Sequence, residues 1–266
     1  MSRNFGLIVI GDEILSGKRV DKHMPKVIEL LAARGLTLAW AEYVGDVPER
    51  ITAALARAFA SGDIVFSTGG IGATPDDHTR QCAAAALGVP LALHPEAEAL
   101  IRERMQDTAR EQGVAYEADR PDNVHRLNMG VFPAGAEIIA NPYNKIPGFS
   151  VADVHFVPGF PVMAWPMIES VLDARYAPLF AHGEGAEKSV IVFGAMEAAL
   201  TPLMEAIEAT HAGIKVFSLP SVDHPEHGRH IELGVKGDRL QVEQAYAQLI
   251  EGLHTFDARL GPELVR

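Results

Sequence analysis

The sequence lacks most features that mark secreted or membrane proteins. It contains one cysteine, Cys82, which excludes an internal disulfide framework and is typical of a reducing compartment. No apolar run approaches the ~20 residues of a membrane-spanning helix. The apolar run Phe5–Ile10 is interrupted at Gly11-Asp12-Glu13, so it does not form a signal peptide. We therefore expect a soluble, cytoplasmic protein without a membrane partner.

Positive charge is also scarce. The chain has 23 Lys and Arg against 35 Asp and Glu, a net charge of −12. This balance argues against nucleic acid or an anionic membrane as the main partner. The length of 266 residues suffices for one large or two modest domains, each with its own core.

The most distinctive stretch is a glycine loop with two acidic residues. The apolar run Ile64–Phe66 leads into Ser67-Thr68-Gly69-Gly70-Ile71-Gly72-Ala73-Thr74-Pro75-Asp76-Asp77-His78-Thr79. A strand, a glycine loop and a helix start present bare backbone amides that suit phosphate. Because Asp76 and Asp77 would repel a bare phosphate, the loop indicates a site for phosphate with a cation, Mg²⁺ being the natural choice.

Apolar runs alternate with helical periodicity through the first two thirds of the chain. Strands are expected near 5–10, 36–44, 63–68, 131–139 and 154–157, and helices at 80–87, 94–113 and 163–176. Residues 115–130 are expected to form a loop or a short excursion over the site. This alternation predicts βαβ units on a mostly parallel sheet. Ligands of such sheets lie beyond the carboxyl ends of the strands, so Asp12-Glu13 and the glycine loop are expected to face one crevice.

The last third has a different pattern. A glycine-containing linker at 178–187 precedes a strand, helix, strand, strand and helix, the βαββα order of a small ferredoxin-like α+β domain. We expect domains at 1–177 and 186–266. In the second of these, His224, His227 and His230 match no defined zinc spacing, and the sequence favours solvated loop histidines.

Several ordered motifs resemble one family. Gly11-Asp12-Glu13-Ile14-Leu15-Ser16-Gly17, the glycine loop, Val44-Gly45-Asp46, Pro147-Gly148-Phe149 and Pro158-Gly159-Phe160-Pro161 follow its order. The first ~170 residues, about one domain in size, resemble the MoaB/Mog molybdopterin-binding fold. They are most similar to the amino-terminal domain of the competence/damage-inducible protein CinA.

This resemblance implies a three-layer α/β/α fold that binds molybdopterin or a nucleotide, with Mg²⁺ as the cofactor. It also implies pyrophosphatase or nucleotidyl-transfer chemistry on compounds such as ADP-ribose or FAD, and a homo-oligomer, dimer or trimer. Asp77 matches the key aspartate of the family. The chain departs from the pattern at His23, Asn144-Lys145-Ile146 and Met163-Ala164, and the last two departures favour the alternative of a non-catalytic binding or scaffold protein.

Candidate site residues follow from the motifs and the resemblance together. Asp77 and Asp76 are assigned to catalysis, and with Asp12 to the metal, against the alternative that they only complement a helix dipole. Thr74 is expected to cap the helix, and Thr68 and Thr79 to offer hydroxyls to phosphate. Lys145 and Arg126 are candidate phosphate clamps, with solvated side chains as the alternative. The full predicted ligand-binding set is Gly69, Gly70, Gly72, Thr68, Thr74, Thr79, Asp12, Glu13, Ser16, Asp46, Lys145, Pro147 and Gly148.

Overall fold

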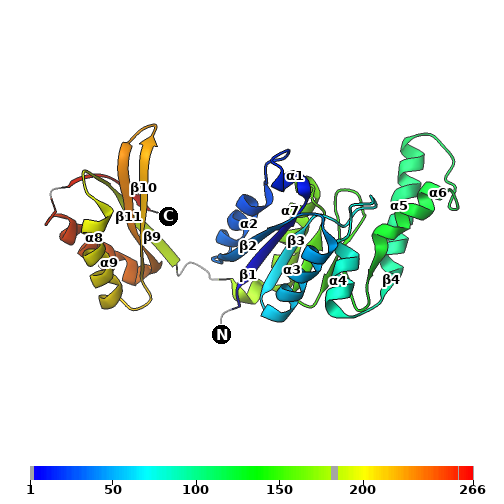
Figure 1. Cartoon of the computed structure of the whole chain (residues 1–266), viewed down its shortest axis with the longest axis horizontal. Coiled ribbons are helices and arrows are strands. Elements are labelled where there is room, and N and C mark those ends of the chain that lie inside the picture. Colours follow the sequence, from blue (N-terminus) through cyan, green and yellow to red (C-terminus); the bar gives the residue numbers. More distant parts are fainter. Residues whose placement is uncertain (1–2, 181–184, 257, 266) are drawn as a thin grey trace. The chain divides into compact units, whose positions relative to one another are not determined.

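The structure, a computed structural model, describes residues 3–180, 185–256 and 258–265. It consists of two compact units, which divide after Phe180 (Figure 1). None of the helices it describes is both long and apolar enough to cross a bilayer.

The first unit is built on a six-stranded sheet. Its strands follow the order β2 (Leu38–Val44), β1 (Phe5–Ile10), β3 (Ile64–Thr68), β8 (Val154–Val157), β7 (Gly148–Val151) and β6 (Glu137–Ile139). The first four of these strands pair in parallel, and β7 and β6 extend the sheet antiparallel. The prediction of a mostly parallel sheet is confirmed.

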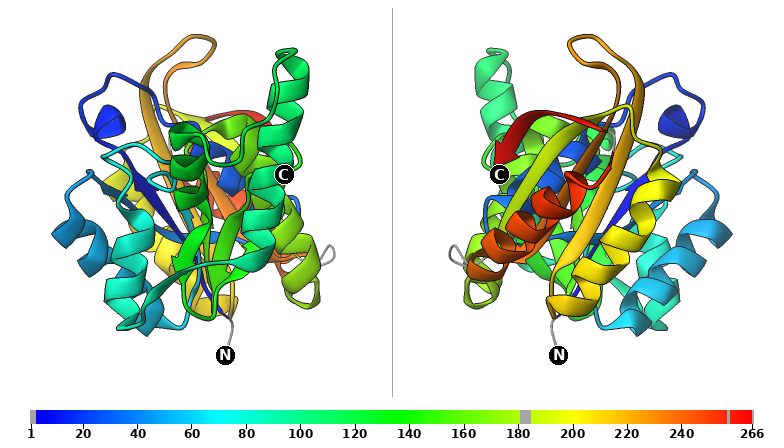
Figure 2. Two further views of the ribbon diagram at one scale, coloured as in Figure 1. Left: turned by 90° about the vertical axis from the view of Figure 1, so that its right-hand side faces the viewer. Right: turned by 90° about the vertical axis from the view of Figure 1, so that its left-hand side faces the viewer.

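Helices cover both faces of this sheet, because its central strands are apolar on both sides (Figures 1 and 2). Along β1, Ile8 and Ile10 pack in the core formed with α3 (Pro48–Ser61) and α4 (Thr79–Leu87). Leu7 and Val9 point the other way, into the core formed with α2 (His23–Ala32) and α7 (Pro161–Arg175). The result is the three-layer α/β/α arrangement.

An arm of the first unit differs from the prediction. Its long helix α5 (Pro95–Glu111) was expected, but residues 115–130 are not one loop: they include α6 (Pro121–Arg126) and the 3₁₀ helix η1 (Leu127–Gly130). A two-stranded sheet of β4 (Leu91–Leu93) and β5 (Val131–Pro133) joins the arm to the rest of the unit. Short elements of this kind carry too few residues to show a period in the sequence.

The second unit has the element order βαββαβ. It consists of β9 (Gly185–Phe193), α8 (Glu197–Thr210), β10 (Lys215–His224), β11 (Gly228–Asp238), α9 (Arg239–Leu253) and β12 (Arg259–Val265). The strands form an antiparallel sheet in the order β10-β11-β9-β12, with both helices packed on one face (Figure 2). Strand β12 was not predicted. It contains Gly261 and Pro262, which are unfavourable inside strands, but β12 lies at the edge of the sheet, where proline is tolerated.

The three histidines of the second unit lie together at the β10–β11 hairpin. The ring centroids of His224 and His227 are 5.0 Å apart, and His230 lies 5.2 and 5.6 Å from them. The expectation of solvated histidines is wrong for His230, which is 7% exposed. Among the described residues no group of three His, Cys, Asp or Glu side chains is arranged to hold a metal ion.

A buried polar network fastens β7 and β8 to the end of α7. His155 is fully buried, and its ring nitrogens lie 2.8 Å from Ser150 Oγ and 2.6 Å from the Tyr176 hydroxyl. Tyr176 donates to Asp153, which also pairs with Arg3. Burial lowers the pKa of His155 to about 3, so the ring is neutral near pH 7.

We therefore predict that stability falls on mild acidification. The unfolded chain protonates His155 near its ordinary pKa of ~6.5, whereas the folded chain does so only near 3. The free energy of unfolding is therefore at its full value above pH 6.5 and decreases as the pH falls below it. The loss is on the order of 1 kcal/mol per pH unit. Urea unfolding at pH 7.0, 6.0 and 5.5 measures it, and His155→Gln should flatten the slope in this range, where few carboxylates titrate. An equal slope in both proteins would contradict the prediction.

Candidate functional site

The carboxyl ends of β1, β3 and β8 meet at one edge of the first unit. Gly11 N donates to Val44 O at 3.0 Å, and Gly69 N donates to Val157 O at 3.1 Å. A crevice of about 410 Å³ lies at this edge, between the glycine loop, the turn after β1 and Pro158–Phe160. The sequence-based expectation that the acidic turn and the glycine loop share one crevice agrees with this arrangement.

The glycine loop passes so close to its neighbours that side chains cannot be accommodated. A Cβ on Gly69 (φ 98°) would lie 2.3 Å from Ile10 O, and one on Gly70 (φ 68°) would lie 2.1 Å from Thr79 Oγ1. Both glycines also have backbone angles that other residues rarely adopt. Thr79 fixes the loop, because its N–H donates to Gly70 O and its hydroxyl to Gly69 O, each at 3.0 Å.

The loop leaves a run of backbone donors unused. The N–H groups of Gly70, Ile71, Gly72 and Ala73 have no hydrogen-bond acceptor among the residues that the structure describes. All of these residues line the crevice. Successive free amides in a glycine-rich turn form a concave anion site, so the loop can bind a phosphate through its main chain.

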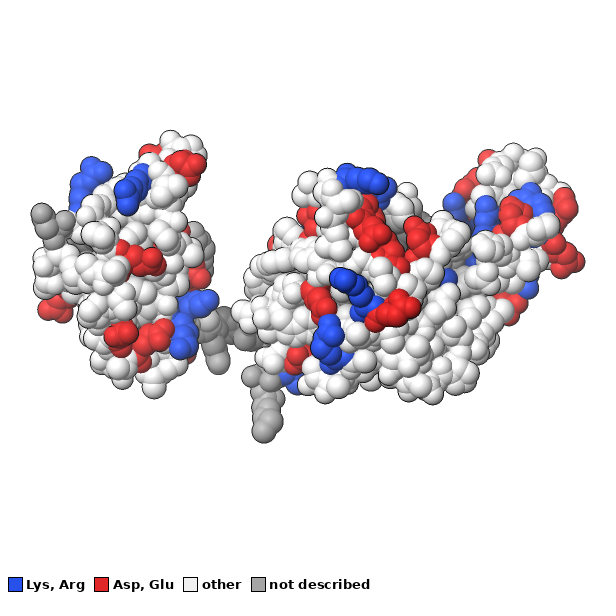
Figure 3. All heavy atoms as spheres, in the orientation of Figure 1, with Lys and Arg blue, Asp and Glu red and all other residues white. Residues whose placement is uncertain are grey.

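Acidic side chains form the opposite rim. Asp12 N donates to Asp46 Oδ2 at 2.8 Å, and Asp46 N donates to Asp12 Oδ1 at 3.1 Å, which joins the two turns reciprocally. Burial raises the pKa of Asp46, and the negative charges of Asp12, Glu13 and Asp76 add to the effect. Figure 3 shows acidic side chains gathered beside α1 (Asp12–Leu15) with basic ones next to them.

The acidic pair of the glycine loop has unequal roles. Asp77 Oδ2 accepts bonds from the N–H and the hydroxyl of Thr74, which closes a tight turn. Asp76 is exposed, and hydrogen bonds, first from Thr74, lower its pKa. Thr74 does not cap the helix: α4 begins at Thr79, and its N-cap residue is His78.

The carboxylates do not form a closed metal cage. Asp12 and Asp77 are engaged by backbone N–H groups, and no three-ligand group is present among the described residues. They fit only the more open mode that Mg²⁺ adopts with phosphates, in which one or two carboxylates join substrate oxygens and water. The assignment of Asp77, Asp76 and Asp12 to a metal stays a hypothesis in that form.

A second compartment of about 420 Å³ continues from the crevice. It shares Ile10, Glu13, Arg19, Gly159 and Phe160 with the first and adds Val9, Ile14, Val20, Lys22, His23, Thr68 and Pro161. Its walls are mainly apolar, and its charged side chains include Arg19 and Lys22. The Phe160 side chain is 55% exposed at the junction of the two compartments.

Two buried polar groups in this second compartment lack partners. Thr68 is 1% exposed, and its hydroxyl has no hydrogen-bond partner. His23 is 5% exposed, and its Nε2 lies 3.0 Å from Gly159 O, so this nitrogen carries the proton. Nδ1 is then an acceptor without a donor. Since unsatisfied buried polar groups are rare in folded proteins, both are candidate ligand contacts.

Some predicted contacts are wrong. Thr79 is fully buried and its hydroxyl is engaged by the loop, so it cannot reach a phosphate. Ser16 is exposed and, like Asp12, lies outside the lining of both compartments. Pro147 and Gly148 are buried at β7, where a Cβ on Gly148 would lie 2.3 Å from Phe156 O. These two residues serve close packing between strands.

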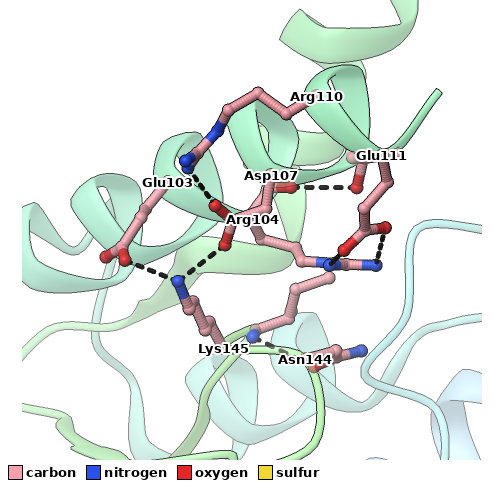
Figure 4. Close-up of polar contacts among 9 residues, drawn as sticks. Glu103, Arg104, Asp107, Arg110, Glu111, Asn144 and Lys145 are labelled. Carbon is pink, nitrogen blue, oxygen red and sulfur yellow. Dashed lines mark hydrogen bonds and ion pairs between the residues drawn. The ribbon is translucent and has the colours of Figure 1, made fainter. Parts of the chain in front are cut away.

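Lys145 is not a clamp in this crevice. Its Nζ donates to Glu103 and Asp107 on α5, each at 2.6 Å (Figure 4). The hydrogen bond that Lys145 donates to Asp107 is the main reason that the pKa of Lys145 is raised. Arg126 donates to Asn123 Oδ1 at 3.3 Å and lies beside α5, also outside both compartments.

Two cations that were not predicted line these cavities: Arg19 lines both compartments, and Lys22 lines the second. Arg19 borders both compartments, and its N–H donates to Glu13 O at 2.9 Å. The signal was present as Lys18, Arg19 and Lys22, three cations within five positions of an acidic chain. They follow directly on the Gly11–Gly17 motif, whose turn returns the chain to the crevice.

A matched pair of substitutions tests this description of the loop. Thr79→Val should lower the free energy of unfolding by about 1–3 kcal/mol, because it leaves the buried Gly69 carbonyl unpaired. Thr68→Val should be neutral or stabilising, because that hydroxyl has no partner to lose. Equilibrium urea unfolding measures both. Equal losses in the two variants would mean that Thr68 has a structural bond of its own.

Comparison with known proteins agrees with this architecture. Residues 6–182 match the family described as "Probable molybdopterin binding domain". A CinA-like protein of Anaeromyxobacter dehalogenans is 36% identical over 160 residues, which is 59% of this chain and 37% of that protein. A protein of Caldivirga maquilingensis is 28% identical over 258 residues, 92% of this chain and 94% of its own.

The crystal structure of CinA from Thermoplasma acidophilum, a protein of unknown function, superposes with a TM-score of 0.55 at 25% identity. It covers 67% of this chain and 100% of that one. The chain spans little more than a third, 37%, of the CinA-like relative from Anaeromyxobacter. With the family match extending over residues 6–182, this chain belongs to the molybdopterin-binding domain family, with a MoaB/Mog-type fold close to that of CinA.

Proposed function

We propose that the first unit binds a phosphorylated pterin or nucleotide in the crevice. The observation that carries the proposal is the run of free N–H groups from Gly70 to Ala73 beside a second, mainly apolar compartment. A phosphate accepts hydrogen bonds from the amides, as anions do at such turns. A heterocycle enters the adjoining compartment, whose volume is within the range of small-molecule pockets.

The second compartment offers contacts that suit a flat heterocycle. Phe160 presents an exposed ring at the junction, and an aromatic face favours stacking with a planar ligand. The Thr68 hydroxyl and His23 Nδ1 supply polar contacts without giving up bonds within the protein. A pterin or purine has both donors and acceptors on its edge, so it can satisfy them.

Arg19 is the proposed charge partner of the phosphate. It lies at the boundary of the two compartments, and no ion pair engages it among the described residues. Arginine suits phosphate because its planar guanidinium donates two parallel hydrogen bonds. The acidic residues that line the crevice, Glu13, Asp46, Asp76 and Asp77, would repel the same phosphate unless a cation accompanies it.

Arg19→Ala tests the binding proposal, with Lys145→Ala as its control. Loss of a charge-assisted hydrogen bond costs about 1.5–3 kcal/mol, so the affinity for ADP-ribose should fall roughly 10-fold or more. Lys145→Ala should bind as the parent does, since Lys145 pairs with α5. Isothermal titration measures both. Equal affinities in all three proteins would contradict the assignment of Arg19.

Magnesium-dependent pyrophosphate cleavage is a second candidate function. The acidic rim opposite the phosphate-binding amides favours it. Mg²⁺ would supply neutralisation of the phosphate charge, while the loop amides stabilise negative charge that develops on an oxygen. The departures at Asn144–Ile146 and Met163-Ala164 favour the alternative in which the protein binds its ligand without converting it.

One assay separates these two candidates. If the protein is a pyrophosphatase, ADP-ribose with Mg²⁺ should give AMP and ribose 5-phosphate. Turnover should then stop with EDTA and in Asp76→Asn, and continue in His227→Ala. If the protein only binds, the nucleotide should raise the melting temperature by mass action without any product. The family resemblance also predicts a dimer or trimer, which light scattering tests.

A further inference from the structure

Another pocket, distinct from the crevice and its second compartment, lies on the other side of the glycine loop and is lined by a buried arginine. This pocket, of about 400 Å³, is lined by Ala73, Thr74, Pro75, Asp77, His78, Arg80, Gln81, Leu91, His125, Asn128 and Val131. The segment from Ala73 to Asp77 borders it on one side and the crevice on the other, although only Ala73, Thr74 and Asp77 line both. We call it the Arg80 pocket.

Arg80 is almost entirely withdrawn from solvent. It is 3% exposed, and its Nη1 donates to the carbonyl of Ile71 in the glycine loop. Among the described residues no carboxylate forms an ion pair with it, and its remaining N–H donors have no acceptor. Burial lowers the pKa of the guanidinium, and the charge of Asp77 offsets only part of this effect.

Such an arginine is unusual, because a buried cation is costly unless it is paired. Arginine stays charged at any pH that proteins tolerate, so it cannot escape the cost by losing its proton. The hydrogen bond to Ile71 O alone does not require an arginine, because a neutral donor could make it. The unused donors face a pocket, and an anion in that pocket would supply the missing partner.

The surroundings of Arg80 also favour an anion. The N–H groups of Arg80 and Gln81 lie in the first turn of α4 and have no acceptor among the described residues. His78, the N-cap residue, makes no side-chain cap. His125 donates from Nε2 to Ala73 O at 2.8 Å, which places a second imidazole in the lining.

Asp77 is the opposing charge in the lining. Its Oδ2 is held by the N–H and hydroxyl of Thr74. That engagement disperses its charge and ties it to the loop. The pocket is therefore lined by one buried arginine and by free N–H groups at the start of α4. The one carboxylate in the lining, Asp77, already accepts hydrogen bonds from Thr74.

We propose that the Arg80 pocket binds a phosphate or phosphomonoester, at a site separate from the crevice. The guanidinium would donate two parallel bonds to the phosphate oxygens, and the first-turn amides of α4 would donate to another. Because Arg80 also holds Ile71 O, an anion there would fix the side chain that supports the glycine loop from behind.

Amide and side-chain ¹⁵N NMR of the full chain tests this site directly, with inorganic phosphate as the probe. Phosphate should shift the Arg80 Nε and Gln81 amide signals saturably, independently of any shift at Gly70–Gly72 in the crevice. Gln81→Glu should raise the phosphate concentration that gives half of the Arg80 shift roughly 10-fold or more, because it adds a negative charge to the lining of the pocket. Gln81 is exposed, so this variant keeps the fold.

Ala85→Glu is the matched control, since it adds the same charge to an exposed position one turn later on α4, outside the pocket. It should bind phosphate within about 2-fold of the parent. The proposal is overturned if Arg80 shows no saturable shift, or if Gln81→Glu and Ala85→Glu behave alike. An acetate response equal to that of phosphate would overturn the assignment to phosphates and indicate a carboxylate site.

Discussion

The close approach of Gly69 to the end of β1 is the constraint on which the site depends. With only 2.3 Å between a would-be Cβ and Ile10 O, the loop after β3 can lie flat against the neighbouring strand only as glycine. Thr79 then pins the loop to α4 through the carbonyls of Gly69 and Gly70. Between these fixed points, the N–H groups of Gly70 to Ala73 have no acceptor among the described residues, and this is the basis of the proposed anion site.

The two faces of this loop explain how one short segment can serve two purposes. Its front presents amides to a crevice with an acidic rim and the cation Arg19. Its back is held by Arg80, whose other donors open into a separate pocket. Burying the Arg80 charge costs free energy, and the hydrogen bond to Ile71 O does not explain that cost, because a neutral donor could make the same bond. An anion bound to Arg80 in that pocket would compensate the cost of burying its charge.

Sequence reasoning located the crevice but assigned several of its contacts wrongly. The glycines at 69, 70 and 72 and the acidic residues at 13, 46, 76 and 77 line the crevice as predicted, because glycine and acidic residues can be recognised in the sequence itself. Thr79 and Lys145 were misassigned because a hydroxyl or an ammonium group can bond to other parts of the protein as readily as to a bound ligand. Which of these a side chain does depends on tertiary partners, here Gly69 O and the α5 carboxylates. Arg19 and Phe160 were not predicted as site residues. They line both compartments only because two turns that are distant in the sequence, one after β1 and one after β8, meet in the folded protein.

The most direct test of the account is a crystal structure of the chain with ADP-ribose bound. We expect a phosphate within hydrogen-bond distance of the Gly70–Gly72 amides and of Arg19, with the adenine beside Phe160 and Thr68. Binding of the nucleotide to the second unit, or in the crevice with its phosphates turned away from the glycine loop, would contradict the account.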